Sequence, residues 1–335
     1  KKKKIAGCTG AKNTANSKSS STPPPSKIAA KNGIKAFDKV ITKDARKDEG
    51  VFTVYEQDGK YFFEINNDLL DREMLMVSRI AGVPPGFSGF SSAGSKSAEQ
   101  VITFSRSKDR ILLRKKSYEA IADEELPVYE SVRANNFEPV IAAFNIEALS
   151  KDSSGIVIDV TDLFTKDVES ISGIPSYLRR TYQIRRLDSD RSFVESVKSF
   201  PENIEVRQVM TYVAGNPPSA EYTQTLSVEV SQSIVLLPEE PMRKRYADYR
   251  VGYFSIRQID YGSDEQKAAQ KEYIRRWRLE PKDPEAYARG ELVEPVKPIV
   301  YYLDPATPEK YRSYIIQGNL DLKEAFEEAG FFFFF

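Results

Sequence analysis

Short runs of alternating apolar and polar residues dominate residues 47–237. Two of them, residues 51–55 and 61–65, flank Asp58-Gly59, and this arrangement predicts a β-hairpin because Asp-Gly readily forms a tight turn. A second hairpin is predicted around residues 107–109. The full set of predicted strands is 51–55, 61–65, 74–80, 101–104, 110–114, 140–146, 155–160, 182–186, 205–212 and 223–237. Consecutive strands with short turns and few long helices between them favour antiparallel sheets.

A helix is predicted between residues 263 and 281, where the pattern changes. Ser263 and Gln266 have the spacing of a capping box. The apolar positions that follow are four residues apart, as one face of a helix requires. They are Ala269, Tyr273 and Trp277. Pro281 ends the predicted helix, and a proline-rich connector follows as far as Pro298.

A strand and a long helix are predicted after this connector. Residues 299–303 form an apolar run of strand length. Thr307 then has the position of a helix cap, with Pro308 at the first helical residue. One apolar stripe continues for about five turns, through Tyr311, Ile315, Gly318, Leu322, Phe326 and Ala329. The expected fold class is α+β: mainly antiparallel β-sheets, with a C-terminal strand and long helix that open an incomplete α/β domain.

These patterns divide the chain into five parts. They are a lipobox-like start with a disordered linker (1–32), a β-rich accessory region (33–237), a helical and proline-rich connector (238–295), the strand–helix unit (296–330) and a homopolymer tail (331–335). The five phenylalanines of the tail fit neither helical nor strand periodicity.

The first eight residues resemble a bacterial lipobox. Four lysines at residues 1–4 form a positively charged region, and residues 5–8, Ile-Ala-Gly-Cys, end in a cysteine after a small residue. Residues 9–27 are rich in Ser, Thr, Asn and Lys, a composition typical of a flexible spacer. We therefore expect Cys8 to be the site of lipid attachment. The alternative is that Cys8 is a free thiol in a disordered tail.

The residue counts exclude several classes of enzyme chemistry. The 335 residues include 49 Lys+Arg and 49 Asp+Glu, so the net charge is zero, which argues against a nucleic-acid partner. The chain has no histidine, and this excludes Ser-His-Asp and Cys-His catalysis and His-containing zinc sites. A single cysteine forms neither an intrachain disulfide nor a thiolate metal cluster. We therefore expect this chain to hold no cofactor and no metal.

The Gly-rich segment 86–97 partly resembles a phosphate-binding loop. Gly89 and Gly94 have the required spacing, but Ser95 separates Gly94 from Lys96. A phosphate loop needs the lysine directly after the second glycine and a helix after the loop, whereas a strand is predicted here. A flexible loop is the favoured interpretation, and such a loop is able to contact a ligand.

Two further patterns fit solvent-exposed positions better than catalytic or metal sites. Ser105 and Lys108 have the Ser-x-x-Lys spacing of penicillin-recognising enzymes, but the companion motifs Ser-Asp-Asn and Lys-Thr-Gly are missing. The acidic residues at 123–125 and 239–240 lack the spacing and the glycine of a calcium loop.

Two basic runs are the most distinctive charged features. They are Arg-Lys-Arg at 243–245 and Arg-Arg-Trp-Arg at 275–278. Arginine interleaved with an aromatic residue is able to bind anions or to stack on rings. Because Asp248 and Glu272 are close in sequence, internal ion pairing is favoured over nucleic-acid binding.

Four segments near the C-terminal end carry a family resemblance. They are LPEEPMR (237–243), YRVGYF (249–254), IRRWRLEP (274–281) and VKPIVYYLD (296–304), and two earlier segments, DEGVFTV (48–54) and AGSK (93–96), join them. They are similar to segments of the large zinc-dependent metalloproteases of Bacteroidetes-type bacteria. The resemblance extends from about Gly33 to Gly330. It implies a cell-envelope, often lipid-anchored, metzincin-type peptidase in the full-length protein, with zinc as its cofactor.

The zinc motif of that family, H-E-x-x-H-x-x-G-x-x-H, does not occur in this chain. The resemblance therefore assigns no catalytic, cofactor-binding or metal residue here, and the chain is expected to be inactive alone. The first functional hypothesis is an N-terminal accessory region of a cell-envelope zinc metalloprotease. The alternative is a self-sufficient β-rich envelope lipoprotein that binds a polymer or partner through the loop at 82–97 and exposed aromatic residues. Both imply a periplasmic or outer-membrane lipoprotein, with a lipid anchor in the membrane, a possible protein or peptide partner and no nucleic acid.

Overall fold

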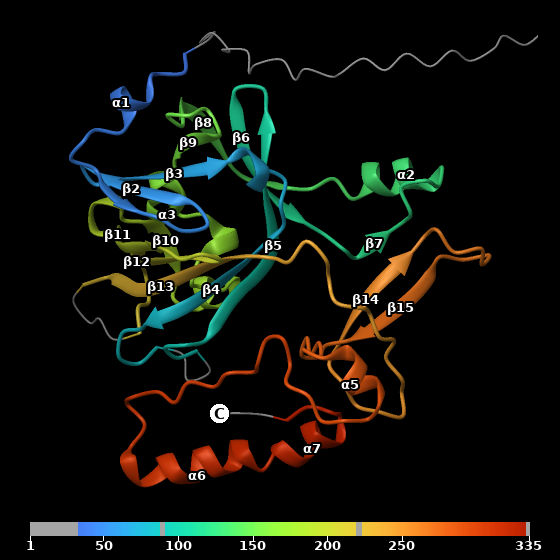
Figure 1. The fold of residues 1–335 in the computed structure, drawn as a ribbon. Helices are drawn as coiled ribbons and strands as arrows, with labels where there is room; N and C mark the ends of the chain where they lie inside the picture. Colours follow the sequence, from blue (N-terminus) through green and yellow to red (C-terminus); the bar gives the residue numbers. More distant parts are fainter. Residues whose placement is uncertain (1–32, 88–90, 219–222, 333–335) are drawn as a thin grey trace, which may run out of the picture.

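The computed structural model describes residues 33–87, 91–218 and 223–332, and one large antiparallel sheet dominates them (Figure 1). In chain order its strands are β1 (Arg46–Asp48), β2 (Thr53–Gln57), β3 (Lys60–Asn66), β4 (Met74–Gly82), β5 (Lys96–Ser107), β6 (Arg110–Lys116), β8 (Val140–Leu149), β9 (Gly155–Asp159), β10 (Ile184–Leu187), β11 (Phe193–Ser199), β12 (Asn203–Ala214) and β13 (Thr225–Leu236). Each predicted strand in residues 51–237 overlaps one of these, and β1 and β11 were not predicted. The predicted α+β fold class with mainly antiparallel sheets is confirmed.

The two ends of the large sheet meet. Across the sheet the order is β1-β2-β3-β9-β8-β6-β5-β4-β13-β12-β10, and β11 also pairs with β12. At the junction, the Val51 amide donates to the carbonyl of Phe200 over 2.7 Å. Ser199 donates from its hydroxyl to the carbonyl of Phe52 (2.6 Å) and from its amide to the carboxylate of Asp48 (2.9 Å). We call this junction the seam, and it nearly closes the sheet around its interior.

Turn chemistry sets the register of both predicted hairpins. Asp58 and Gly59 both have positive φ, 50° and 72°, which is the backbone of the tight turn that matches strand twist. The turn pairs Gln57 with Lys60. In the second hairpin Ser107 pairs with Arg110 across a two-residue turn.

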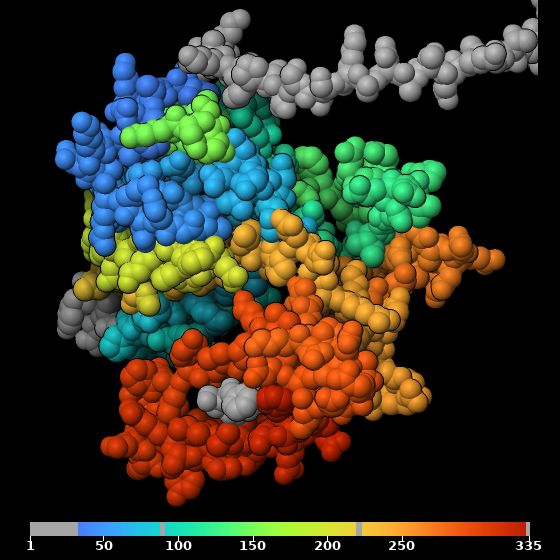
Figure 2. All heavy atoms as spheres, in the orientation of Figure 1, coloured from blue at the N-terminus to red at the C-terminus, as the bar shows by residue number. Residues whose placement is uncertain are grey.

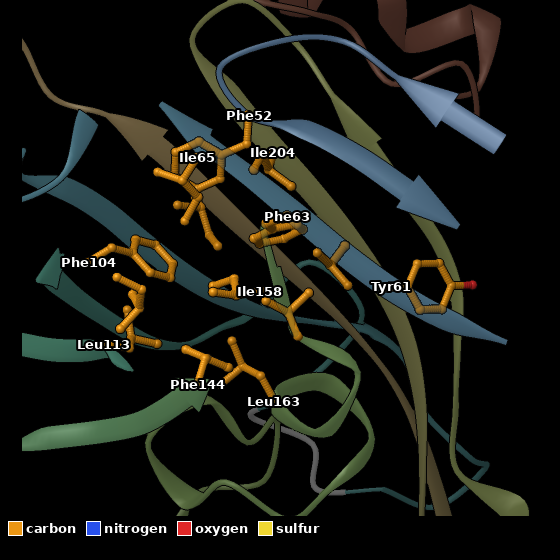
Figure 3. Close-up of a cluster of buried hydrophobic side chains, with 14 of the residues drawn as sticks. Phe52, Tyr61, Phe63, Ile65, Phe104, Leu113, Phe144, Ile158, Leu163 and Ile204 are labelled. Carbon is orange, nitrogen blue, oxygen red and sulfur yellow. The ribbon is translucent and has the colours of Figure 1, made fainter. Parts of the chain in front are cut away.

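The largest buried cluster lies inside the curled sheet (Figure 3). The ring of Phe52 is 5.7 Å from that of Phe63 and 5.5 Å from that of Phe104, between centroids. Phe63 in turn is 6.2 Å from Phe164. These fully buried rings come from the first hairpin (Phe52 and Phe63), from β5 (Phe104) and from α3 (Phe164). Aromatic pairs at such distances stabilise a core beyond the area that they bury, so they hold the opposite walls of the sheet together.

Short helices lie in the connections between strands. They are α1 (Phe37–Val40), α2 (Val128–Asn135), α3 (Thr161–Thr165) and α4 (Ser176–Thr181), with 3-10 turns at Asn67–Leu69, Glu169–Ile171 and Ser189–Arg191. Residues between α3 and the end of α4 bury Ile171, Ile174 and Leu178. This connection therefore packs against the sheet and is not a free loop.

The helix predicted at 263–281 is wrong. Strands β14 (Ser255–Asp260) and β15 (Ala269–Ile274) form an antiparallel hairpin there, and β7 (Ala120–Ile121) adds a parallel third strand. This small sheet lies to one side of the large one (Figure 1). Ser263, expected to cap the helix, has a buried hydroxyl with no hydrogen-bond partner among the described residues. Pairing with β14 overrides the local helical pattern, because β-structure depends on its partner strands.

The C-terminal unit also differs from expectation. Residues 299–303 form no strand, and only Ile299 among them is buried. The helix begins at Glu309, directly after Pro308, and ends at Leu320 as α6. A separate helix, α7 (Lys323–Glu328), follows, and α5 (Pro284–Ala288) precedes both, capped by the Asp283 carboxylate. The predicted continuous five-turn helix is therefore two helices.

The seam leaves no space for a side chain at Gly50. A Cβ atom there would lie 2.4 Å from the Ser199 hydroxyl and 2.5 Å from the carbonyl oxygen of Phe200. Gly50→Ala should therefore force the two sheet ends apart and lower the free energy of unfolding by about 1–3 kcal/mol. Urea denaturation measures this change. Gly252→Ala is the matched control, because nothing lies within 4 Å of a Cβ there, and equal losses in the two variants would contradict the prediction.

Candidate functional site

Most of the residues that the sequence singled out lie apart from one another. Cys8, the predicted lipid attachment site, and Gly89 of the Gly-rich loop lie outside the described residues. Lys96 begins β5 and forms an ion pair with Glu99 at 2.5 Å. A strand follows this loop instead of a helix, so the arrangement of a phosphate-binding loop is not present.

The Ser-x-x-Lys pair occupies the second hairpin. The hydroxyl of Ser105 accepts a hydrogen bond from Nε of Arg114 at 3.1 Å and donates to the carbonyl of Leu112 at 3.4 Å. Lys108 is in the turn, with φ of 56°. These contacts give Ser105 a structural role between neighbouring strands.

The structure brings the two basic runs together, which the sequence analysis did not foresee. Arg276 donates from Nη2 to the carbonyl of Arg243 at 2.7 Å, and Arg278 donates from Nη1 to the carbonyl of Glu240 at 2.8 Å. These bonds hold residues 242–246 beside residues 276–280. An open cleft of about 590 Å³ lies between the two segments, and we call it the cationic cleft. Its lining consists of Met242, Arg243, Lys244, Arg245, Tyr246, Arg276, Arg278, Leu279 and Glu280.

The acids expected to neutralise these arginines bind elsewhere. Asp248 forms its ion pair with Arg250 at 2.7 Å, and this pairing lowers the pKa of Asp248 below its usual value. Glu272 accepts hydrogen bonds from Ser255 and Arg257, which lower the pKa of Glu272. The predicted pairing of these two acids with the basic runs is therefore wrong.

The charge of the cationic cleft is only partly balanced. Arg278 forms an ion pair with Glu280 at 2.8 Å. Among the described residues, Arg243, Arg245 and Arg276 have no ion pair. Partial burial, together with the nearby charge of Arg245, lowers the pKa of Arg276. Positive charges crowded in this way are suited to bind an anion.

A second cleft, of about 650 Å³, lies between β6 and α2. Arg114 places its guanidinium 5.4 Å from the ring centroid of Phe137, and Tyr118 and Tyr129 also line the space. Burial, with a hydrogen bond to Glu73, raises the pKa of Tyr118. Basic and acidic side chains both line this cleft, so it lacks the one-sided charge of the cationic cleft.

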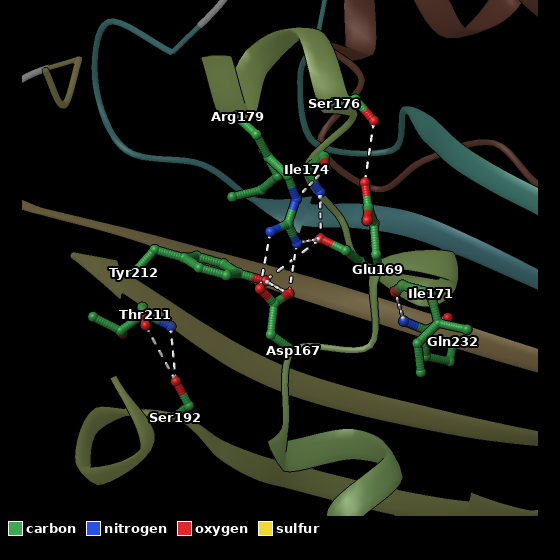
Figure 4. A network of polar contacts seen from close by, with 11 residues as sticks. Asp167, Glu169, Ile171, Ile174, Ser176, Arg179, Ser192, Thr211, Tyr212 and Gln232 are labelled. Carbon is green, nitrogen blue, oxygen red and sulfur yellow. Dashed lines mark hydrogen bonds and ion pairs between the residues drawn. The ribbon is translucent and has the colours of Figure 1, made fainter. Parts of the chain in front are cut away.

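A partly exposed polar network fastens the connection between α3 and α4 to the sheet (Figure 4). Arg179 binds Asp167 through two parallel hydrogen bonds of 2.9 and 2.6 Å. The same guanidinium donates to the Ser172 hydroxyl at 2.8 Å and lies 5.3 Å from the centroid of the Tyr212 ring. The Tyr212 hydroxyl donates to Asp167 at 3.3 Å. Every charged member has a partner, so we interpret this network as structural.

An exposed apolar surface follows α6 and the segment before it. Tyr302 is 92% exposed and Tyr314 is 76% exposed. Val300, Tyr301, Tyr311, Ile315 and Leu322 are also exposed. Figures 1 and 2 show α6 along the outer edge of the molecule, on the side away from the N-terminal strands. Exposed apolar side chains that are concentrated in one segment indicate an interaction site, whereas scattered single residues do not.

Neither a metal site nor a membrane span is found in the described part of the chain. Within it, no three Asp, Glu, Cys or His side chains are grouped so that they could hold a metal ion. Among the described helices, none combines the length and the apolar composition needed to cross a bilayer.

Comparison with protein families gives two matches. Residues 94–282, more than half of the chain, match the family described as Domain of unknown function (DUF5117). The chain belongs to the DUF5117 family. Residues 34–83 match a second family, Domain of unknown function (DUF5118). Searches of curated proteins and of solved structures return no match.

The DUF5117 match contains both clefts and the polar network. Both basic runs lie within it, so the cationic cleft is formed by DUF5117 residues alone. The network residues of the same match come from separate parts of the chain: Asp167 from the loop after α3, Arg179 from α4 and Tyr212 from β12. No local spacing connects those three residues, and for this reason sequence reasoning missed the network.

Tyr212 makes stability depend on pH in the alkaline range. Burial, with a smaller contribution from the charge of Asp167, raises the pKa of Tyr212 to about 12 from 10.0. Between these values the unfolded chain releases the phenolic proton while the folded chain retains it, so stability falls as pH rises. The loss is at most about 2–3 kcal/mol.

Tyr212→Phe should remove this contribution, and its free energy of unfolding should fall less steeply than that of the wild type between pH 10 and 12. Denaturant titrations at several pH values measure both slopes. Tyr249→Phe is the control, because that ring is almost fully exposed. Identical slopes for the wild type and Tyr212→Phe would show that Tyr212 does not titrate as proposed.

Proposed function

We propose that this chain is a non-catalytic accessory region of a cell-envelope zinc-dependent metalloprotease, and that α6 packs against the peptidase domain. The exposed apolar face of α6 is the observation that carries the proposal. The resemblance of residues 237–304 to such proteases supports it and supplies the identity of the partner.

We assign catalysis to the peptidase domain because this chain lacks the residue type that the zinc motif needs. The zinc motif of the family uses histidines that face one side of a helix, with a glutamate as the base. This chain has no histidine at any position, so its own residues are unable to form that motif. The zinc of the proposed enzyme therefore belongs to the peptidase domain.

Three of the five large apolar side chains of α6, those of Tyr311, Tyr314 and Ile315, lie on one face of the helix, whereas Ile316 and Leu320 lie on other sides. Tyr311, Tyr314, Ile315 and Gly318 follow the spacing that places residues on a single side, and Leu322 continues the stripe just beyond the helix. A helix of a globular protein normally turns such a stripe toward a core. No residue of α6 is buried. The peptidase domain is the proposed cover, because residues 296–304, which precede this helix, are among those that resemble the protease.

Hydrogen–deuterium exchange tests the docking of α6. The measurement compares the present chain with the proposed longer protein that also contains the peptidase domain. Amides of residues 309–320 should exchange more slowly there than in the present chain, because the stripe is then covered. Ile315→Asp should abolish the added protection, since a charge buried in an apolar interface is costly. In the present chain the same variant should change the free energy of unfolding by no more than about 0.5 kcal/mol.

Ser313→Asp is the matched control, because it adds the same charge to the same helix on the opposite face. It should leave the added protection intact. Equal exchange of α6 in both proteins, or a gene without an H-E-x-x-H motif, would overturn the accessory role. The self-sufficient binding module would then be the better explanation.

The proposed location is the cell envelope, with Cys8 as the lipid-modified residue. A lipid-modified cysteine holds a protein at the membrane when it carries enough acyl chains, since a single chain binds only marginally. Cys8→Ser in the natural precursor should therefore move the protein from the membrane fraction to the supernatant after cell fractionation. Thr9→Ser is the control and should stay with the membrane. Membrane retention of the Cys8→Ser protein would contradict lipid attachment at this residue.

A further inference from the structure

We propose that the cationic cleft between residues 242–246 and 276–280 is a binding site for a phosphate group. The site is independent of the proposed accessory role, because it lies in the DUF5117 match and uses no residue of α6.

The first argument is the local charge. Arg243, Lys244, Arg245, Arg276 and Arg278 face one cleft in which Glu280 is the single acidic lining residue. The chain as a whole carries equal numbers of basic and acidic residues, so this excess is not a consequence of a basic protein. Of the acids close in sequence, Asp248 forms an ion pair with Arg250 and Glu239 with Arg72, while Glu280 pairs with Arg278 inside the cleft.

The second argument is the way in which the cations are held. Arg276 is fixed by hydrogen bonds from its guanidinium to the carbonyls of Arg243 and Trp277, at 2.7 and 3.2 Å. Lys244 donates to the side-chain oxygen of Gln258 at 3.2 Å and lies 5.1 Å from the Tyr273 ring. Neutral partners therefore orient these two cations without cancelling their charge. A preorganised set of donors loses less entropy when an anion binds.

The third argument is that the charge of Arg276 is only partly neutralised, because the nearby Glu280 does not outweigh burial and the charge of Arg245. Burial and the neighbouring Arg245 both act against its positive charge, as its lowered pKa indicates. An anion between Arg245 and Arg276 would attract both guanidinium groups and so offset the repulsion between their positive charges. The arrangement is therefore unfavourable when the cleft is empty and favourable when an anion occupies it.

The chemistry of the donors favours phosphate over carboxylate. A guanidinium presents a planar fork of N–H donors, and this fork matches two oxygens of a phosphate group. A phosphate monoester carries close to two negative charges at neutral pH and offers three acceptor oxygens, so it balances several converging arginines better than one carboxylate does. The cleft is open, and Tyr246 at its edge is 66% exposed, so there is space for the molecule that carries the phosphate.

The chain contains a built-in probe for this site. Trp277 is the single tryptophan, it lies between Arg276 and Arg278 in sequence, and its carbonyl accepts a hydrogen bond from Arg276. Pyrophosphate titrated into the full chain at constant ionic strength should change the fluorescence of Trp277 and reach saturation. Sodium chloride at the same ionic strength should leave the fluorescence unchanged.

The Arg243→Gln, Arg245→Gln double variant tests the assignment. Both side chains are exposed and lack ion pairs among the described residues, so the fold should persist. Loss of two charged donors should weaken pyrophosphate binding by about tenfold or more. The control is the double variant Arg46→Gln, Arg133→Gln, which removes the same charge from exposed positions outside the cleft. Equal binding by the cleft variant and the control, or a response that follows ionic strength alone, would overturn the proposal.

Two sources of phosphate are separated by a second measurement. The chain is sedimented with vesicles of phosphatidylcholine alone and with vesicles that also contain phosphatidic acid. Co-sedimentation that needs phosphatidic acid and is lost in the Arg243→Gln, Arg245→Gln variant assigns the site to a lipid headgroup. Saturable pyrophosphate binding without co-sedimentation assigns it to a soluble phosphate ester. Failure of both measurements would refute the site and leave the accessory role untouched.

Discussion

Closure of the large sheet is the constraint on which the rest of the structure depends. Without the seam hydrogen bonds between Val51 and Phe200 and between Ser199 and Phe52, the aromatic core would be open on one side. The N–H and C=O groups at the two edges of a sheet need hydrogen-bond partners. Here each edge supplies some of the partners for the other. Gly50 allows this approach because it has no side chain.

The same closure makes the two family matches one structural unit. Strand β3, in the DUF5118 match, pairs with β9 of the DUF5117 match, and β4 pairs with both β5 and β13. The DUF5118 strands are thus inserted between DUF5117 strands on both of their sides. In this chain the strands of the two matches therefore form a single sheet.

The alternation of apolar and polar residues made the strands of residues 51–237 predictable. The hairpin after Pro238 was not predicted, because the spacing of its apolar residues fits both a helix and a strand. Ala269 and Tyr273 are four residues apart, and this interval places side chains on one face of a helix and equally on one face of a strand. The deciding feature is the partner strand at Ser255–Asp260, which pairs Ile256 with Tyr273. Residues 299–303 show the reverse case, since a β-like composition formed no strand where these residues pair with no other strand.

The wrong prediction of a helix at residues 263–281 is also the reason why the cationic cleft was not predicted. In a helix, Glu272 would lie one turn before Arg276, which is the favourable order for an ion pair four residues apart. In the hairpin, Glu272 instead lies opposite Arg257 and binds it across the strands. The strand register therefore removes one of the two acids that lie four residues from Arg276 in the sequence, and the two basic runs meet without it. The unpaired arginines follow from strand pairing, so the sequence alone showed which residues were basic but not that their charge would remain available.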